Sequence, residues 1–271
     1  MIRSNPVKTR LAAGQKCLGL WLVANSSMNA EIVAQAGFDF VIIDHEHGPG
    51  DLMGAAGQMQ ALRSGSIGAA NHDGREPGGP AVLLRVPWND TPYIKRALDT
   101  GAEGIMVPYV ETAAEAEAAV RACKYPPAGN RGCAVSAIRA TGFGHASAEY
   151  WNRIGDEVCT VIQIETQKGI ANIPEIAQVE GVDILFIGPT DVTATSGFNP
   201  TAPTAESRAI VESAEAAVKA SGKPMAAVPH SGHSPAQMFE RGYDLVAAGS
   251  DLSLIRAGAR AAMDAHRERW G

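Results

Sequence analysis

The chain has 271 residues, of which 45% are hydrophobic and 19% are charged, and its formal net charge at pH 7 is −6. This length and composition predict one large globular domain, and the acidic balance, without any run of five basic residues, argues against a nucleic-acid or anionic-membrane surface. The basic amino terminus lacks a hydrophobic signal region, and no apolar run approaches the ~18 residues that a membrane span needs. The four cysteines share no metal-ligand spacing, so we expect reduced thiols in a cytoplasmic protein.

Eight short apolar stretches with the composition of strands alternate with helical stretches along the chain. Regular alternation of strand and helix predicts a parallel sheet, and eight units favour closure into a TIM barrel of one domain. No glycine-rich dinucleotide motif or P-loop motif opens any of the helices. The clearest helices are residues 113–122 and 205–220. The strand candidates are residues 18–22, 40–43, 82–86, 104–107, 158–164, 184–187, 225–228 and 245–248.

Two segments interrupt this alternation. Residues 64–80 are rich in glycine, proline and polar side chains, and we expect a flexible insertion there. Because it precedes the third strand, it should lie at the amino-terminal end of the barrel, away from the usual active site, with His72 as a solvent-exposed bystander. Residues 124–154 fall between the fourth and fifth strands. We expect this second segment to leave the carboxyl end of the fourth strand and to form a lid or an arm between subunits.

Four ionisable side chains follow the second strand without a break: Asp44, His45, Glu46 and His47. Burying such groups at a strand end is unfavourable unless they have partners or a function. Polar clusters at strand ends are typical of functional sites, and we favour that interpretation. The alternative is a solvated loop in which Asp44 or Asp51 caps the next helix.

Polar residues also follow other strands. Arg85 ends the third strand, Gln163 and Glu165 share one face of the fifth, and Asp191 follows the sixth after a Gly-Pro turn. In a barrel these ends converge, so Glu165 and Asp191 form a pair of oxygen ligands suited to Mg²⁺, Mn²⁺ or Co²⁺ rather than to structural Zn²⁺. The alternatives are a salt bridge between Glu165 and Lys168 and a helix N-cap at Asp191.

Several longer motifs carry a resemblance to a known family. They are Gly19-Leu20-Trp21, Ala36-Gly37-Phe38-Asp39, Ile43-Asp44-x-Glu46-His47-Gly48-Pro49, Leu84-Arg85-Val86-Pro87, Tyr125-Pro126-Pro127-x-Gly129-x-Arg131-Gly132, Gln163-Ile164-Glu165-Thr166 and Phe186-Ile187-Gly188-Pro189-x-Asp191. In this order they resemble the HpcH/HpaI family of metal-dependent pyruvate aldolases, typified by 4-hydroxy-2-oxoheptanedioate aldolase. The match spans most of the chain, and His45 lies outside the family pattern.

This resemblance implies a TIM barrel that cleaves a 4-hydroxy-2-oxo acid into pyruvate, or a close 2-oxo acid, and an aldehyde. It implies a divalent metal held by Glu165 and Asp191, with the 2-oxo acid bound through its carboxylate and keto oxygens. It also implies His47 as the acid/base residue and Arg85 as the group that faces the pyruvyl oxygen. A homo-oligomer, usually a hexamer built from dimers, is implied as well.

The chemistry agrees with this assignment. Cleavage leaves negative charge on the C2 oxygen of an enolate, which either a Schiff-base lysine or a metal can stabilise. No lysine lies on a predicted strand, so the metal remains, with Arg85 sharing the charge. His47 removes the C4 hydroxyl proton directly or through a polarised water. Asp44 or Asp99 would orient that imidazole, Asp99 from a neighbouring subunit.

The rest of the predicted substrate site comes from two strand ends. Backbone N–H groups of Thr190 and Asp191 are suited to hold the substrate carboxylate, and Gln163 points to the same mouth.

Three other functions compete with the aldolase. An acyl-CoA lyase is disfavoured because no basic patch suits the CoA phosphates. A decarboxylase or synthase acting on an oxaloacetate-like substrate would use the same enolate chemistry. A catalytically dead barrel kept as a binding module is disfavoured by the intact set His47, Arg85, Glu165 and Asp191.

Overall fold

The computed structural model describes residues 2–73 and 78–270. Its strands are β1 Cys17–Leu22, β2 Phe40–Asp44, β3 Ala81–Arg85, β4 Gly104–Val107, β5 Cys159–Ile164, β6 Ile184–Ile187, β7 Met225–Ala227 and β8 Leu245–Ser250. Its helices are α1 Pro6–Ala12, α2 Ser27–Ala36, α3 Leu52–Asp73, α4 Thr91–Asp99, α5 Ala113–Cys123, η1 Arg139–Thr141, α6 Ser147–Glu157, α7 Gln167–Ala171, α8 Ile173–Ile176, α9 Pro189–Thr195, α10 Ala205–Ser221, α11 Pro235–Glu240 and α12 Asp251–Trp270. None of the helices in these described ranges is long and apolar enough to cross a membrane.

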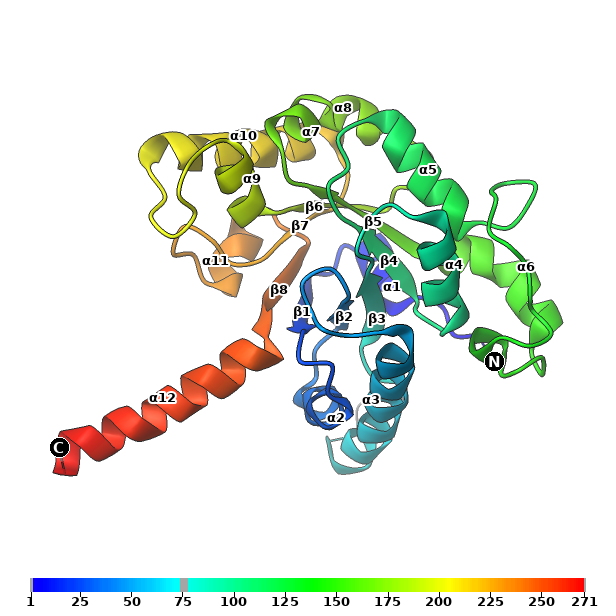
Figure 1. Ribbon diagram of the computed structural model, residues 1–271, viewed down its shortest axis with the longest axis horizontal. Coiled ribbons are helices and arrows are strands. Elements are labelled where there is room, and N and C mark those ends of the chain that lie inside the picture. The colour runs from blue at the N-terminus through cyan, green and yellow to red at the C-terminus, as the bar shows by residue number, and fades with distance from the viewer. Residues whose placement is uncertain (1, 74–77, 271) are drawn as a thin grey trace.

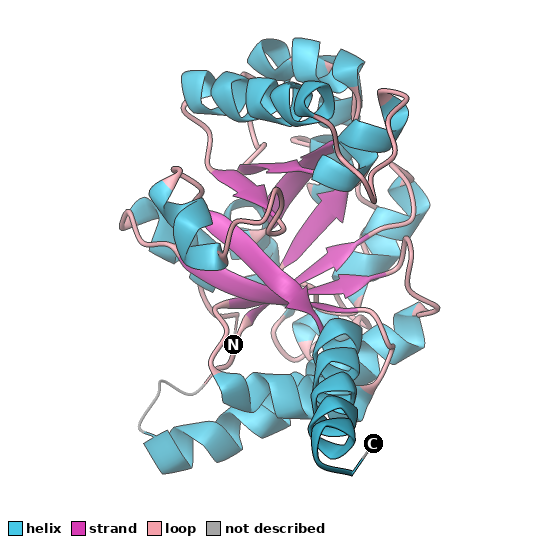
Figure 2. Ribbon diagram, turned by 90° about the vertical axis from the view of Figure 1, so that its left-hand side faces the viewer, coloured by secondary structure: helices cyan, strands magenta, loops and turns pink. Residues whose placement is uncertain are grey.

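The eight strands are parallel, pair in chain order and close into a barrel through the pairing of β8 with β1. Figure 2 shows the strands at the centre with helices around them. The predicted TIM barrel is confirmed.

Alternate residues of the strands point into the barrel. One buried cluster includes Trp21, Phe40, Ile42, Leu83, Met106, Val161 and Phe186. Trp21 and Phe186 lie on strands that are not neighbours in the sheet, yet their rings meet edge to face with centroids 6.0 Å apart, so this cluster fills the barrel interior. Asp44 and Arg85 continue the interior positions of β2 and β3, which brings both side chains to the carboxyl-terminal mouth of the barrel.

Helix α3 corrects the prediction of an irregular insertion at residues 64–80. The helix continues to Asp73, while residues 74–77 and the side chain of His72 lie outside the described part of the chain. A Cβ on Gly65 would lie only 2.6 Å from the carbonyl oxygen of Glu31 in α2. The glycine therefore allows two helices to approach closely, and in the sequence such a glycine looks like one that breaks a helix.

Residues 124–154 lie at the amino-terminal end of the barrel, so their predicted departure from the carboxyl end of β4 is wrong. Helix α5 follows β4 and returns the chain to the opposite end before this segment begins. Arg131 donates a hydrogen bond to Asp99 at 2.8 Å, and Arg139 donates one to the carbonyl oxygen of Thr100 at 2.6 Å, both at the end of α4. The segment is therefore no lid over the mouth of its own chain.

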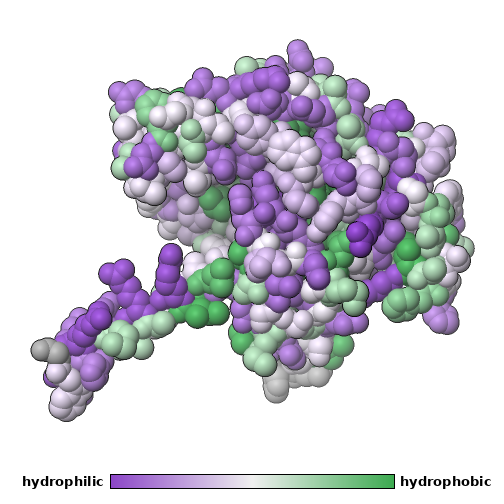
Figure 3. Space-filling model, viewed as in Figure 1, coloured by the Kyte–Doolittle hydropathy of each residue, from purple (hydrophilic) through white to green (hydrophobic). Residues whose placement is uncertain are grey.

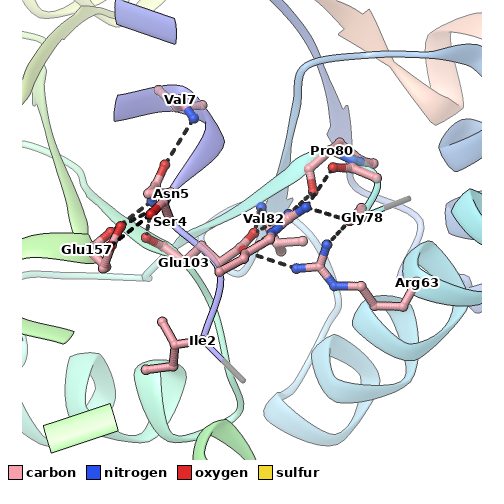
Figure 4. Close-up of polar contacts among 12 residues, drawn as sticks. Ile2, Ser4, Asn5, Val7, Arg63, Gly78, Pro80, Val82, Glu103 and Glu157 are labelled. Carbon is pink, nitrogen blue, oxygen red and sulfur yellow. Dashed lines mark hydrogen bonds and ion pairs between the residues drawn. The ribbon is translucent and has the colours of Figure 1, made fainter. Parts of the chain in front are cut away.

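The amino-terminal segment closes this same end of the barrel (Figure 4). Arg3 donates hydrogen bonds to both carboxylate oxygens of Glu103, at 2.5 and 2.8 Å, and to the backbone carbonyls of residues 78–80. The backbone N–H of Asn5 donates to Glu157 at 2.7 Å. These residues line a cavity of about 520 Å³ that contains none of the side chains predicted for the active site.

Helix α12 projects away from the barrel (Figure 1). Its one buried residue is Asp251, whose carboxylate accepts hydrogen bonds from the backbone N–H groups of Val23 and Ala24 at 3.0 and 3.3 Å. The large apolar side chains exposed along the helix are Leu252, Leu254, Ile255, Met263 and Trp270. Figure 3 shows apolar surface where the helix leaves the barrel. About half or more of each of these side chains is exposed in a single chain.

Candidate active site

Asp44 and Arg85 face each other at the ends of two neighbouring strands. The sheet register pairs them, and the guanidinium donates from Nε to Oδ1 at 2.9 Å and from Nη2 to Oδ2 at 2.8 Å. Burial opposes ionisation of Asp44, but the hydrogen bonds and charge of Arg85 outweigh it and hold the pKa of the carboxyl below its ordinary value. A bidentate pair of this kind fixes both the position and the plane of the guanidinium.

Two further contacts hold Arg85. Its Nη1 lies 2.8 Å from Oε2 of Glu46, and its Cζ lies 4.3 Å from the centroid of the Trp21 ring. Burial raises the pKa of Glu46 in spite of the nearby guanidinium charge. With carboxylates on its edges and a ring against its face, Arg85 is a fixed cationic donor whose remaining N–H groups are available to a ligand.

Asp44 also holds the loop that follows β2. Its Oδ1 accepts hydrogen bonds from the backbone N–H groups of Glu46 at 3.1 Å and His47 at 3.3 Å. The side chain of His47 is 66% exposed at the rim, with Nε2 3.9 Å from Oε2 of Glu46. Within one chain, Asp44 therefore positions the backbone of His47 and not its imidazole.

Among the carboxyl groups at the mouth, Glu165 has the pKa that departs furthest from its ordinary value. Gln163 donates from Nε2 to its Oε1 at 2.6 Å, and the backbone N–H of Tyr109 donates to its Oε2 at 2.8 Å. Burial, and after it the charge of Asp191, raises the pKa of Glu165 to about 8. The Oε1 atom of Gln163 is buried without a hydrogen-bond partner among the described residues. A nearby cation would favour the ionised form of this carboxyl group.

Asp191 lies in the first turn of α9, directly after β6. Its charge raises the pKa of both Glu165 and Glu46, so carboxylates from three strand ends share one region. In residues 2–73 and 78–270, no group of three or more His, Cys, Asp and Glu side chains is arranged to hold a metal ion. Glu165 and Asp191 fit a hard divalent cation whose other ligands come from substrate and water, as Mg²⁺ accepts. The crowded negative charge and the unpartnered Gln163 oxygen agree with such a cation.

The competing local roles belong to other residues. Lys168 forms its salt bridge with Glu111, at 2.9 Å, and not with Glu165. The start of α9 has no side-chain capping bond, so Asp191 is no N-cap. Of the two residues considered as the cap of the helix after β2, it is Asp51 that accepts a hydrogen bond from a backbone N–H in the first turn of α3, at 2.7 Å. The local roles considered for Glu165 and Asp191 are therefore not the ones these two residues have.

Three residues discussed in the sequence analysis lie in surroundings other than those of the carboxylates at the mouth. Two were predicted for the site, and the third, His45, lies outside the family pattern. Thr190 is exposed at the start of α9. Asp99 lies at the far end of α4, bonded to Arg131. His45 is buried on the helix-facing side of β2, with Nδ1 2.9 Å from the Tyr93 hydroxyl, and burial lowers its pKa. The side chains that one chain brings together at the mouth are Asp44, Glu46, Arg85, Gln163, Glu165 and Asp191.

Sequence reasoning missed an aromatic part of the mouth. Trp21 supports Arg85, and its interior position on β1 was the available signal. Tyr109 bonds Glu165 through its backbone, a role that no sequence pattern marks. Its ring stacks on Trp88 with centroids 5.7 Å apart and an angle of 27° between the planes.

Comparisons with known proteins agree with this geometry. The chain matches the family described as HpcH/HpaI aldolase/citrate lyase over residues 17–257. It is 39% identical over 258 residues to a hydroxypyruvate/pyruvate aldolase of Pseudomonas aeruginosa, a match that covers 94% of this chain and 90% of that protein. It is 38% identical over 266 residues to a 4-hydroxy-2-oxo-heptane-1,7-dioate aldolase of Escherichia coli, covering 95% and 93%.

A solved structure gives the same result. A HpcH/HpaI aldolase/citrate lyase family protein from Burkholderia cenocepacia J2315 superposes with a TM-score of 0.87 and 32% identity, covering 97% of this chain and all of that one. The resemblance carried by the motifs is thus confirmed at the level of sequence and of fold. The chain belongs to the HpcH/HpaI aldolase/citrate lyase family and is a carbon–carbon lyase.

Proposed function

We propose that this lyase is a divalent-metal-dependent aldolase that reversibly cleaves a 4-hydroxy-2-oxo acid to an aldehyde and pyruvate, or a close 2-oxo acid such as hydroxypyruvate. The observation that carries the proposal is the convergence of Glu165 and Asp191 with the fixed guanidinium of Arg85 at one mouth. The names of the two aldolase relatives support the same reaction class.

Glu165 and Asp191 would hold Mg²⁺, Mn²⁺ or Co²⁺. When bound, the cation supplies positive charge that stabilises the enolate oxygen at C2 of the 2-oxo acid. Burial and the charge of Asp191 raise the pKa of Glu165, and the positive charge of a bound cation favours its ionised form. No lysine is buried among the residues that the structure describes, in agreement with a cation rather than a Schiff base at the keto carbon.

Arg85 donates to the keto oxygen and shares the negative charge that develops as the C3–C4 bond breaks. Since Asp44, Glu46 and Trp21 already fix the guanidinium, it needs no reorganisation when substrate binds. The substrate carboxylate is assigned to Gln163 and to the backbone N–H groups of Thr190 and Asp191.

His47 takes the proton of the C4 hydroxyl, directly or through a water, and returns it in the reverse reaction. Its exposed position at the rim gives it access to the aldehyde end of the substrate. Asp44 positions it through the backbone. Because Asp99 is bonded to Arg131 at the opposite end of α4, its part in orienting the imidazole requires a second copy of the chain.

We also propose a homo-oligomer, a hexamer formed as a trimer of dimers, in which a second copy covers α12. Apolar side chains are exposed along α12, most closely spaced at its start, and exposed apolar surface of this kind marks an interaction site. Exposed apolar residues of α2 and α3 offer a matching surface on the barrel; they are Met28, Ile32, Met53 and Ile67.

Metal removal tests the proposal. We expect EDTA to abolish the formation of aldol product from pyruvate and an aldehyde, measured by product mass, and Mg²⁺, Mn²⁺ or Co²⁺ to restore it. Full activity after exhaustive chelation, or pyruvate trapped on a lysine by borohydride, would contradict it. Release of CO₂ from oxaloacetate without any aldol product would favour the decarboxylase, and a requirement for an acyl-CoA ester would favour the acyl-CoA lyase.

A further inference from the structure

We propose that Trp88 and Tyr109 form a platform for the aldehyde half of the substrate and select uncharged aldehydes that carry a flat apolar group. This inference rests on the proposed aldolase function and specifies the part of the substrate that the strand-end residues leave open.

The two rings lie beside the proposed chemistry. Trp88 follows Arg85 by three residues at the end of β3, and Tyr109 follows β4 by two residues. The backbone N–H of Tyr109 bonds Oε2 of Glu165 at 2.8 Å, so its ring cannot lie far from the space above the carboxylates. Trp88 is 57% exposed and Tyr109 40% exposed, which leaves ring surface open to a ligand at the mouth.

The backbone holds Tyr109 in an uncommon conformation. Its φ is +55°, a left-handed value that side chains larger than those of glycine and asparagine adopt infrequently. The same conformation directs the N–H to Glu165 while the ring stacks on Trp88. Such conformations cluster at functional sites, where contacts compensate for them. A stack whose Tyr109 backbone is held by Glu165 is a partly preformed surface, and preformed surfaces bind with less loss of conformational entropy.

The charges around the platform argue against an acidic aldehyde. Glu111 follows Tyr109 by two residues, and its carboxylate accepts a hydrogen bond from the ammonium of Lys168 at 2.9 Å. The guanidinium of Arg85 is held by Asp44 and Glu46. Both of these cations are therefore already paired with carboxylates, whereas a semialdehyde with a terminal carboxylate would need a cation beside the rings. Aromatic faces instead favour stacking with a flat apolar group.

The test compares three aldehydes with pyruvate and Mn²⁺. In the wild type, kcat/KM for benzaldehyde should exceed that for succinic semialdehyde by tenfold or more. Trp88→Ala should lower kcat/KM for benzaldehyde roughly tenfold, mainly through KM, and lower that for glycolaldehyde less than threefold. Trp88→Phe keeps a flat ring and should recover most of the loss. Exchange of the pyruvate methyl protons for deuterium needs no aldehyde, and in Trp88→Ala it should change less than aldol addition to benzaldehyde.

A matched control removes a second half-exposed tryptophan from a stack. Trp151 is 46% exposed and stacks on Tyr125 with centroids 5.0 Å apart, in the segment at the amino-terminal end of the barrel. Trp151→Ala should keep the wild-type preference among the aldehydes.

Two results would overturn the platform while leaving the aldolase intact. One is a wild type that exchanges pyruvate protons but prefers succinic semialdehyde. The other is an equal loss for all three aldehydes in Trp88→Ala, with a change in oligomer mass by light scattering, since the rings would then belong to a subunit contact. Absence of both exchange and aldol product in the metal-loaded wild type would overturn the proposed function and this inference with it.

Discussion

The carboxylate of Asp44 is shared between two tasks at the mouth of the barrel. Both oxygens bind Arg85, and one also accepts the backbone N–H groups that begin the loop carrying His47. A strand end thus fixes both the guanidinium of Arg85 and the loop that carries His47. Removing either partner of a buried ion pair leaves an uncompensated group and is strongly destabilising.

Arg85→Lys tests the geometry of this pair rather than its charge. An ammonium cannot span Asp44 and Glu46 while presenting a planar donor to the keto oxygen. We expect kcat for aldol cleavage to fall by about 10²–10³-fold and the melting temperature to fall as well. Arg153→Lys is the control, because Arg153 lies at the other end of the barrel, where it pairs with Glu149 and Glu157 and donates to the carbonyl of Ile2. Equal kcat in Arg85→Lys and wild type would remove Arg85 from the chemistry.

A second buried carboxylate makes stability depend on pH. Burial opposes ionisation of Glu215, but hydrogen bonds from His230, Tyr243 and Arg241 outweigh it and lower its pKa to about 2. The ordinary value in an unfolded chain is about 4.3. The ionised group therefore stabilises the fold above this value, and the contribution is lost as pH falls from about 4.3 towards 2.

Glu215→Gln should remove this dependence. At pH 7 we expect the variant to lose about 2 kcal/mol of stability, and between pH 5 and 3 its free energy of unfolding should fall less steeply than that of the wild type. Urea unfolding at each pH measures both quantities. Glu149→Gln, at an exposed pair on α6, should leave the slope unchanged. A variant as steep as the wild type would show that other groups control acid unfolding.

At the scale of elements, the sequence predicted the strands well because each is a short apolar run between polar turns. Two glycines that follow helix ends were also predictable. Gly101 and Gly242 have φ values of 99° and 100°, positive values that glycine adopts readily where a helix ends. The strand-end side chains followed from topology, since parallel strands end at one mouth. The predicted course of residues 124–154 is wrong because α5 returns the chain to the amino-terminal end of the barrel before this segment begins.

Other parts of the site were beyond prediction for a physical reason. The ring direction of His47 depends on a side-chain rotamer, which leaves no periodic signal. The same holds for the stack of Trp88 on Tyr109. Spacing in a sequence reports the direction of a strand, whereas these features depend on loops.

Helix α3 supplies a prediction with an internal control. A Cβ on Gly65 would meet the Glu31 carbonyl at 2.6 Å, while one on Gly68, a single turn later, would meet nothing within 4 Å. Gly65→Ala should therefore destabilise the fold by about 1–3 kcal/mol. Gly68→Ala should stabilise it by up to about 1 kcal/mol, because alanine favours a helix. Urea unfolding of both variants gives the comparison, and two effects of the same sign would contradict the close packing of α2 and α3.

At the scale of the whole molecule, α12 gives the proposed assembly a direct test. Leu254 and Ile255 are 54% and 58% exposed in a single chain. Changing both to Asp should break the contact with a second copy, and light scattering should show a species of lower mass than the wild type. Arg256→Ala, on the same helix, should keep the wild-type mass. A wild type that is monomeric would exclude an assembly through α12.

The contacts of Arg3 and Asn5 join residues far apart in the sequence, so they can form only late in the synthesis of the chain. Arg3 emerges from the ribosome 100 residues before its partner Glu103, and Asn5 emerges 152 residues before Glu157. The amino-terminal segment therefore lacks its contacts with Glu103 and Glu157 until those residues have emerged, whatever the state of β1 and β2. Nascent chains gain residues at about 5–20 per second. The contacts that close this end of the barrel therefore form many seconds after the amino-terminal residues have been synthesised. A chaperone that binds nascent chains would therefore encounter this segment before it has formed its contacts with Glu103 and Glu157.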